Sequence, residues 1–128
     1  MDQGELVRSG HIIVRGMDDA GIPPQLAMWV RSNDADIWKL WIVPPAALKD
    51  KQEFYRRASE IIASHRTELG DITISDLEMQ SASHPAVQGL SFAFRFEGLG
   101  SARFTGNIFN GFYLPDGIVL RSAVERQR

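Results

Sequence analysis

Two carboxylates and a histidine near the middle of the chain are the residues whose types could support catalysis. Asp76 and Glu78 lie on the same side of the chain if residues 72–79 form a strand, and His84 follows in a loop. Carboxylates and imidazole bind divalent metals and act as general bases near neutral pH. One alternative is therefore a small metal-dependent hydrolase or nuclease. Against it, Gln80 stands where a D…E-x-K nuclease core has its lysine.

Two arginines form a second candidate site. If residues 98–100 form a hairpin loop, Arg95 lies opposite Arg103 on the solvent-facing side of two paired strands. Like charges in these positions repel each other unless Glu97 relieves the repulsion or an anion binds between them. If an anion binds between the two arginines, we expect it to be a phosphate, a carboxylate or an acidic protein surface. Binding of a nucleic acid on this face is a further alternative.

Composition and motifs argue against several classes of protein. The chain has 128 residues, of which 44% are hydrophobic, enough for one domain with its own core. It has no cysteine, which excludes disulfides, thiolate metal sites and cysteine nucleophiles. The only glycine pair that suggests a dinucleotide fingerprint, in Gly98-Leu99-Gly100, lacks the third glycine and the following helix. No cofactor is therefore expected.

The same sequence features favour a soluble cytoplasmic protein. Residues 1–5 lack the basic and apolar segments of a signal peptide. The apolar runs are much shorter than the roughly 20 residues that a membrane-spanning helix needs. The net charge of −2 gives no general attraction to nucleic acid or to anionic lipid. We therefore expect neither a membrane nor a nucleic acid as the main partner.

All three tryptophans lie in residues 27–43, where two apolar runs flank a polar centre. This pattern predicts a β-hairpin with its tip at residues 33–34. In that register Arg31 pairs with Asp36, and Trp29 pairs with Trp38. The second strand is apolar on both faces, which is typical of a strand covered on two sides. Trp41 on its second face is thus a candidate interface residue, covered by a helix or by a partner chain.

Helical spacing of apolar residues predicts two helices. The first covers residues 4–20 and ends at Gly21, although a strand at residues 11–15 is an open alternative because two glycines interrupt the helix. The second covers residues 50–69, with Asp50 as its cap and Gly70 as its stop.

The second half of the chain predicts an antiparallel meander. We expect strands at residues 72–79, with an interruption near 75–76, and at 90–97, 101–108, 112–114 and 118–120. Turns are expected at residues 110–111 and 115–117, and residues 81–89 are expected to form a loop or a single turn. The predicted fold is α+β, with a mainly antiparallel sheet of about five to seven strands and two helices packed on one face. Residues 1–121 form a single domain, and 122–128 a flexible tail.

The pattern in the first half of the chain resembles a loosely defined group of small bacterial proteins that have no known function. The resemblance rests on residues 21–24, on residues 27–30 and 38–42, and on Tyr55 in a capped helix. It implies the α+β fold and a bacterial source, and it transfers no catalytic residue.

The function that follows is a non-enzymatic binding or assembly module that acts through protein–protein contacts. The expected partner is another protein or a second copy of the chain. An edge strand at residues 119–121, which has no proline or lysine to block pairing, and the face around Trp41 are the predicted contact surfaces.

Overall fold

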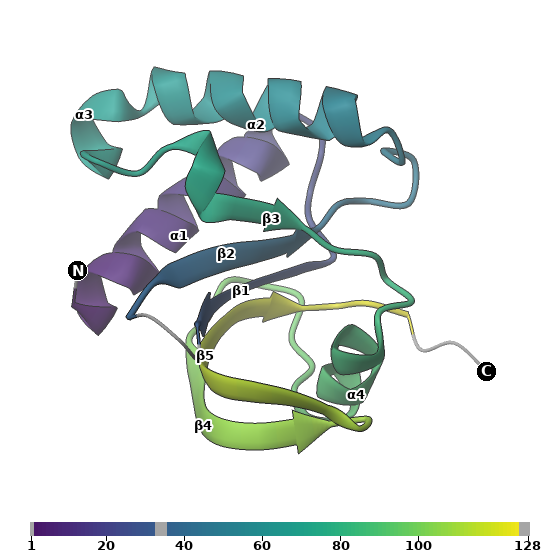
Figure 1. The fold of residues 1–128 in the computed structure, drawn as a ribbon. Coiled ribbons are helices and arrows are strands. Elements are labelled where there is room, and N and C mark those ends of the chain that lie inside the picture. Colours follow the sequence, from purple (N-terminus) through teal and green to yellow (C-terminus); the bar gives the residue numbers. More distant parts are fainter. Residues whose placement is uncertain (1, 33–35, 126–128) are drawn as a thin grey trace.

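The computed structural model describes residues 2–32 and 36–125, in which helices cover both faces of one five-stranded sheet (Figure 1). None of the helices in these two ranges is long and apolar enough to cross a membrane. In chain order the elements are α1 (Gln3–Asp19), β1 (Leu26–Arg31), β2 (Trp38–Val43), α2 (Lys51–Ser64), α3 (Arg66–Leu69), a 3₁₀ turn (Ile74–Asp76), β3 (Leu77–Met79), α4 (Pro85–Ala93), β4 (Ala102–Phe109) and β5 (Phe112–Ser122).

The strand order is β3-β2-β1-β5-β4. Three of the four strand pairs are antiparallel, whereas β3 runs parallel to β2. The parallel pair needs a crossover connection, which α2 and α3 supply. The predicted α+β class is thus confirmed with five strands, but the sheet is mixed, and four α-helices rather than two occur among the described residues.

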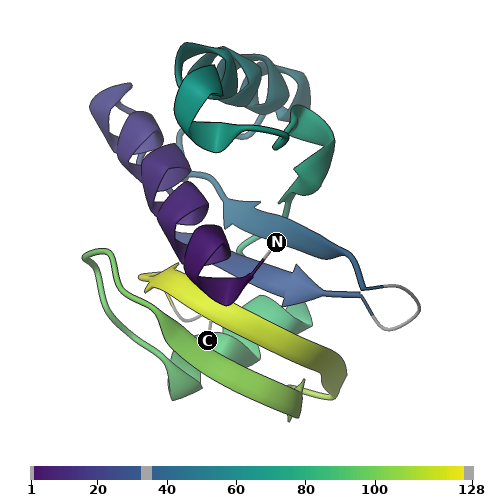
Figure 2. The same ribbon diagram turned by 90° about the vertical axis from the view of Figure 1, so that its left-hand side faces the viewer.

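The sheet separates two hydrophobic cores. On one face α1 and α2 pack over buried side chains that include Ile13, Trp29 and Phe54. On the opposite face α4 packs over a second set that includes Met28 and Leu90. Figure 2 shows α1 and α2 on one side of the sheet and α4 behind it. The prediction that the helices share one face is therefore wrong for α4.

Residues 11–15, for which a strand was the open alternative, belong to α1. The indole Nε1 of Trp29 on β1 donates to the backbone carbonyl of Leu6 at 2.7 Å, which fixes the helix against the sheet. A Cβ at Gly10 would lie 2.9 Å from that Nε1. The glycine that weakens the helix in the sequence is thus the residue that lets the helix approach Trp29.

The predicted tryptophan hairpin is present as β1 and β2, but its register differs by two residues. Arg31 pairs with Trp38 rather than with Asp36. Trp29 pairs with Leu40 rather than with Trp38. Because strand side chains alternate with a period of two, the shift leaves each side chain on its predicted face. The predicted two-residue tip lies outside the described residues.

The first half of the strand predicted at residues 90–97 is instead the second half of α4. His84 caps this helix, and Pro85 occupies its first turn, a position that proline favours. The buried residues of α4 follow helical spacing: Ala86, Val87, Leu90 and Ser91. Phe92, which the alternating pattern placed inside, is 66% exposed. The alternating phenylalanines therefore do not form one strand, because Phe92 lies in α4 and the others lie in the loop that follows it.

The turn predicted at residues 110–111 is confirmed, whereas the one at 115–117 is not. Asn110 and Gly111 have φ angles of 52° and 82°, which suits the tight turn between β4 and β5. Residues 115–117 continue β5, because Asp116 pairs with Thr105 on one side and accepts from Arg31 Nε of β1 at 2.8 Å on the other.

The continuous β5 strand changes the edges of the sheet. It lies between β1 and β4, so residues 119–121 are in the interior of the sheet and not at the predicted unguarded edge. The strands with an open side are β3 and β4.

The segment predicted as a tail begins inside the fold. The hydroxyl of Ser122 donates to the carbonyl of Phe94 at 2.7 Å, and Val124 is fully buried in the second core. Residues 122–124 therefore pack with the domain, and residues 126–128 of the predicted tail lie outside the described ranges.

A bidentate ion pair joins β5 to the end of α1 and gives a first prediction. Arg121, which is only 9% exposed, donates from both terminal nitrogens to Asp18 at 2.7 and 2.9 Å. The hydrogen bond to Asp18 raises the pKa of Arg121. Asp18→Ala leaves this cation buried without its anionic partner, so we expect the free energy of unfolding in urea to fall by about 2 kcal/mol, less than for a fully buried pair.

The matched control is Asp19→Ala, which removes an exposed neighbouring carboxylate and should change stability by less than about 0.5 kcal/mol. Adding Arg121→Met to Asp18→Ala should recover part of the loss, since the unpaired cation is then absent. Equal losses in Asp18→Ala and Asp19→Ala would contradict this role.

A second prediction concerns the contact between α4 and the β4–β5 turn. A Cβ at Gly89 would lie 2.8 Å from the backbone of both Phe109 and Asn110, so the two elements touch through their backbones. Gly89→Ala should therefore lower the free energy of unfolding by about 1–2 kcal/mol, despite the higher helix propensity of alanine. Thermal unfolding of both variants measures this change. Gly98→Ala is the control, because a Cβ at Gly98 meets nothing within 4 Å, and it should leave the free energy of unfolding unchanged.

Candidate functional site

The three residues of the predicted metal or general-base cluster lie in three different elements: the 3₁₀ turn, β3 and the start of α4. Asp76 ends the 3₁₀ turn, and its carboxylate accepts the backbone N–H of Thr73 at 2.9 Å. Leu77 belongs to the core under α2, so Glu78 projects to the α4 face, where its charge acts on His84. No group of three His, Asp or Glu side chains suited to a metal occurs in the part of the chain that the structure describes.

His84 has a structural environment. Its Nδ1 accepts the backbone N–H of Ala86 at 3.1 Å, which caps the start of α4. Its ring lies edge-on to Trp41 and Phe112, with centroid distances of 5.3 and 4.8 Å. Burial lowers the pKa of His84, and the charge of Glu78 partly opposes this shift. The neutral imidazole thus joins the strand β2, the helix α4 and the β4–β5 hairpin.

Trp41, the predicted interface residue, is covered from within the chain. Its side chain is 8% exposed, and Phe112 lies edge-on to it at 6.5 Å between ring centroids, beside His84. The second apolar face of β2 is therefore explained by α4 and the β4–β5 hairpin, which sequence analysis did not place there.

The predicted arginine pair does not form, because residues 90–97 are not a strand beside β4. Arg95 donates from Nη1 to the carbonyl of Val124 at 2.7 Å. Arg103 is exposed on β4, where its cross-strand partner is Ile118. The two cations thus have separate roles: Arg95 holds the chain near its C-terminus, and Arg103 lies on an open strand.

The β4–β5 hairpin carries exposed apolar residues near its tip. Ile108 and Tyr113 are cross-strand partners, and they are 65% and 50% exposed. Within the described residues no strand pairs with the outer side of β4. Sequence analysis predicted an edge strand but assigned it to residues 119–121, because it divided β5 at Pro115.

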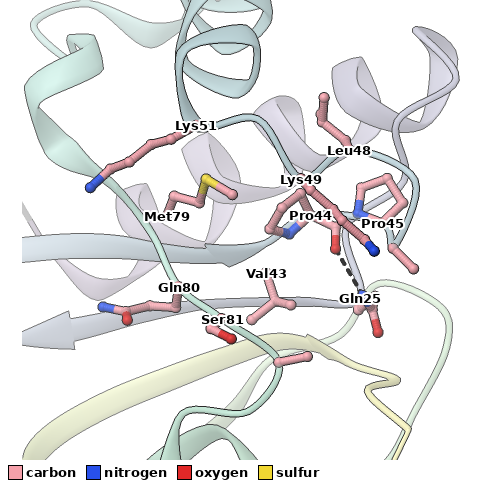
Figure 3. A pocket seen from close by; sticks show the side chains of 12 residues that line it. Gln25, Val43, Pro44, Pro45, Leu48, Lys49, Lys51, Met79, Gln80 and Ser81 are labelled. Atoms are coloured by element: carbon pink, nitrogen blue, oxygen red, sulfur yellow. Dashed lines mark hydrogen bonds between the residues drawn. The ribbon is translucent and has the colours of Figure 1, made fainter.

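A cavity of about 530 Å³ lies where the parallel strands β2 and β3 end (Figure 3). The loop between β2 and α2 forms one wall, and the segment after β3 forms another. The residues that line it are Gln25, Val43, Pro44, Pro45, Ala46, Leu48, Lys49, Lys51, Met79, Gln80, Ser81 and Ala82. The carboxyl ends of parallel strands are a common place for ligands in α/β sheets.

Sequence analysis missed this cavity, although one signal was available. The run from Pro44 to Asp50 ends a buried strand and precedes a capped helix, a connection that forms ligand sites in α/β units. This connection indicates a ligand site only if β3 runs parallel to β2, and the sequence alone did not show that.

Comparison of the chain with family models, curated proteins and solved structures found no match. The resemblance to small bacterial proteins stays a prediction, and functional inference rests on the geometry of the described residues.

The environment of His84 predicts a pH dependence of stability. The fold favours the neutral imidazole, so its contribution is complete above the ordinary pKa of 6.5 and is lost as the pH falls through the lower pKa of the folded state. We expect the advantage of the native protein over His84→Asn in urea unfolding to shrink between about pH 8 and about pH 5. Asparagine caps helices without titrating, and the other histidines are common to both proteins. A pH-independent difference would contradict this assignment.

Proposed function

We propose that this chain is a non-enzymatic binding module that takes an extended segment of another protein as an added strand at β4. The observation that carries the proposal is the outer side of β4, which no other described strand covers. An unpaired strand offers a row of backbone donors and acceptors, and proteins use such edges to bind extended peptides. The exposed pair Ile108 and Tyr113 beside this edge adds apolar surface for side chains of the bound segment.

The charge on β4 favours a partner with acidic residues. The eight residues of β4 contain no carboxylate, and the side chain of the exposed Arg103 makes no hydrogen bond or ion pair with any other described residue. A segment that alternates apolar and acidic residues would satisfy both features. A second copy of the chain would bring another β4 without a carboxylate, so a different protein is the favoured partner.

The enzyme alternative has less support. The carboxylate of Asp76 accepts a hydrogen bond within the 3₁₀ turn, Glu78 lies on β3, and His84 is occupied as a helix cap. Binding of nucleic acid is also less supported, because Arg95 is bonded within the fold and Arg103 is the one cation among the eight residues of β4.

The proposal is tested by selecting binders from a library of random heptapeptides. We expect the selected peptides to alternate apolar and acidic residues, and to slow amide hydrogen exchange along β4 when bound. Arg103→Glu should weaken the best acidic peptide about tenfold, which corresponds to about 1.4 kcal/mol.

Arg15→Glu makes the same charge change at an exposed position of α1, next to Gly16, which packs against Ile61 of α2, and serves as the control. If both variants weakened peptide binding equally, the net charge of the protein and not the position of Arg103 would explain the loss. Selected peptides that protect amides elsewhere, or a library that yields no binder, would overturn the proposal.

A further inference from the structure

The cavity at the ends of β2 and β3 has an apolar interior. Val43 and Pro44 are buried in its floor, and Leu48 and Met79 are half-buried at its sides. In Figure 3 the side chains of Val43 and Met79 lie in the middle of the site. Its volume of about 530 Å³ falls in the range of roughly 300–1,000 Å³ that is typical of small-molecule sites. The apolar wall calls for a ligand with a hydrocarbon or aromatic body.

The rim of the cavity is positively charged. Two of the three lysines of the chain, Lys49 and Lys51, line it, and none of the described lining residues is acidic. Figure 3 shows that Lys49 extends toward Gln25, whereas Lys51 extends to the other side of the site. The intervening Asp50 is engaged as the cap of α2, since its carboxylate accepts the N–H of Gln52 at 2.9 Å.

The polar groups of the rim leave donors free for a ligand. Lys49, Lys51 and Gln80 make no hydrogen bond or ion pair through their side chains with any other described residue. By contrast, the third lysine, Lys39, donates to the carbonyl of Ser75 at 2.6 Å. Gln25 is held in place, because its Nε2 donates to the carbonyl of Pro44 at 2.8 Å.

From these features we propose that the cavity binds an organic anion that carries a carboxylate on an apolar body, with a medium-chain fatty acid as the simplest example. The carboxylate accepts from Lys49 or Lys51 and from the amide of Gln80. The apolar body lies against Val43, Met79 and their neighbours. An inorganic anion would leave this apolar wall exposed to water, and an organic cation would meet two ammonium groups.

The test is a titration with decanoate below its micelle concentration, followed by NMR of side-chain methyl groups. We expect saturable shifts of the methyl groups of Val43, Leu48 and Met79. The double variant Lys49→Gln/Lys51→Gln should bind decanoate about tenfold more weakly. The control variant Arg8→Gln/Arg15→Gln removes the same charge from exposed positions on α1 and should bind as the native protein does.

Two further probes separate the components of the proposal. Acetate supplies the carboxylate alone, and decyltrimethylammonium supplies the apolar chain with the opposite charge. Binding of either probe as tightly as decanoate would overturn the assignment, as would decanoate shifts centred outside the cavity or equal weakening by the control variant. The readout lies on β2 and β3, at the opposite edge of the sheet from β4, so its outcome is independent of the proposed peptide binding.

Discussion

Burial of β1 on both of its faces is the constraint on which the rest of the structure depends. Every residue from Leu26 to Val30 is buried, and alternate side chains enter different cores. A strand of this kind requires neighbours on both sides and helices on both faces. The β2 and β5 strands supply the neighbours, α1 and α2 cover the first face, and α4 covers the second. Trp29 adds a directional element, because its hydrogen bond to Leu6 sets where α1 crosses the strand.

The second core is closed by contacts that are far apart in the sequence. The β4–β5 hairpin reaches α4 through the backbone contact at Gly89, and it reaches β2 through the rings of Phe112, His84 and Trp41. The hairpin therefore covers an apolar face that would otherwise be exposed. This arrangement accounts for the apolar character of β2 without a partner chain, and it leaves the outer side of β4 as an open edge.

The two proposed binding surfaces lie at opposite edges of the sheet and differ in chemistry. The β4 edge offers backbone groups, an apolar pair and one arginine, which suits an extended acidic and apolar segment. The cavity beside β2 and β3 offers an open, partly apolar volume with two lysines, which suits a small organic anion. Both proposals concern binding and include no bond-breaking step.

The sequence by itself determined the elements whose signals are local. The periodicity and caps of α1 and α2, the two tryptophan strands and the turn at Asn110-Gly111 were all predictable, because each depends on residues close in the chain. The tertiary structure alone decided the hairpin register, the path of β5 through Pro115 and the parallel pairing of β3. Those features depend on partners such as Arg31 with Asp116, which lie 85 residues apart. The candidate sites followed the same division, since the cavity and the open β4 edge exist only once distant strands are side by side. For α4 the sequence contains both the helical spacing of the buried residues and an alternation of phenylalanines that fits a strand equally well. Packing against the second core favours the helix, and this packing depends on residues that are distant in the sequence.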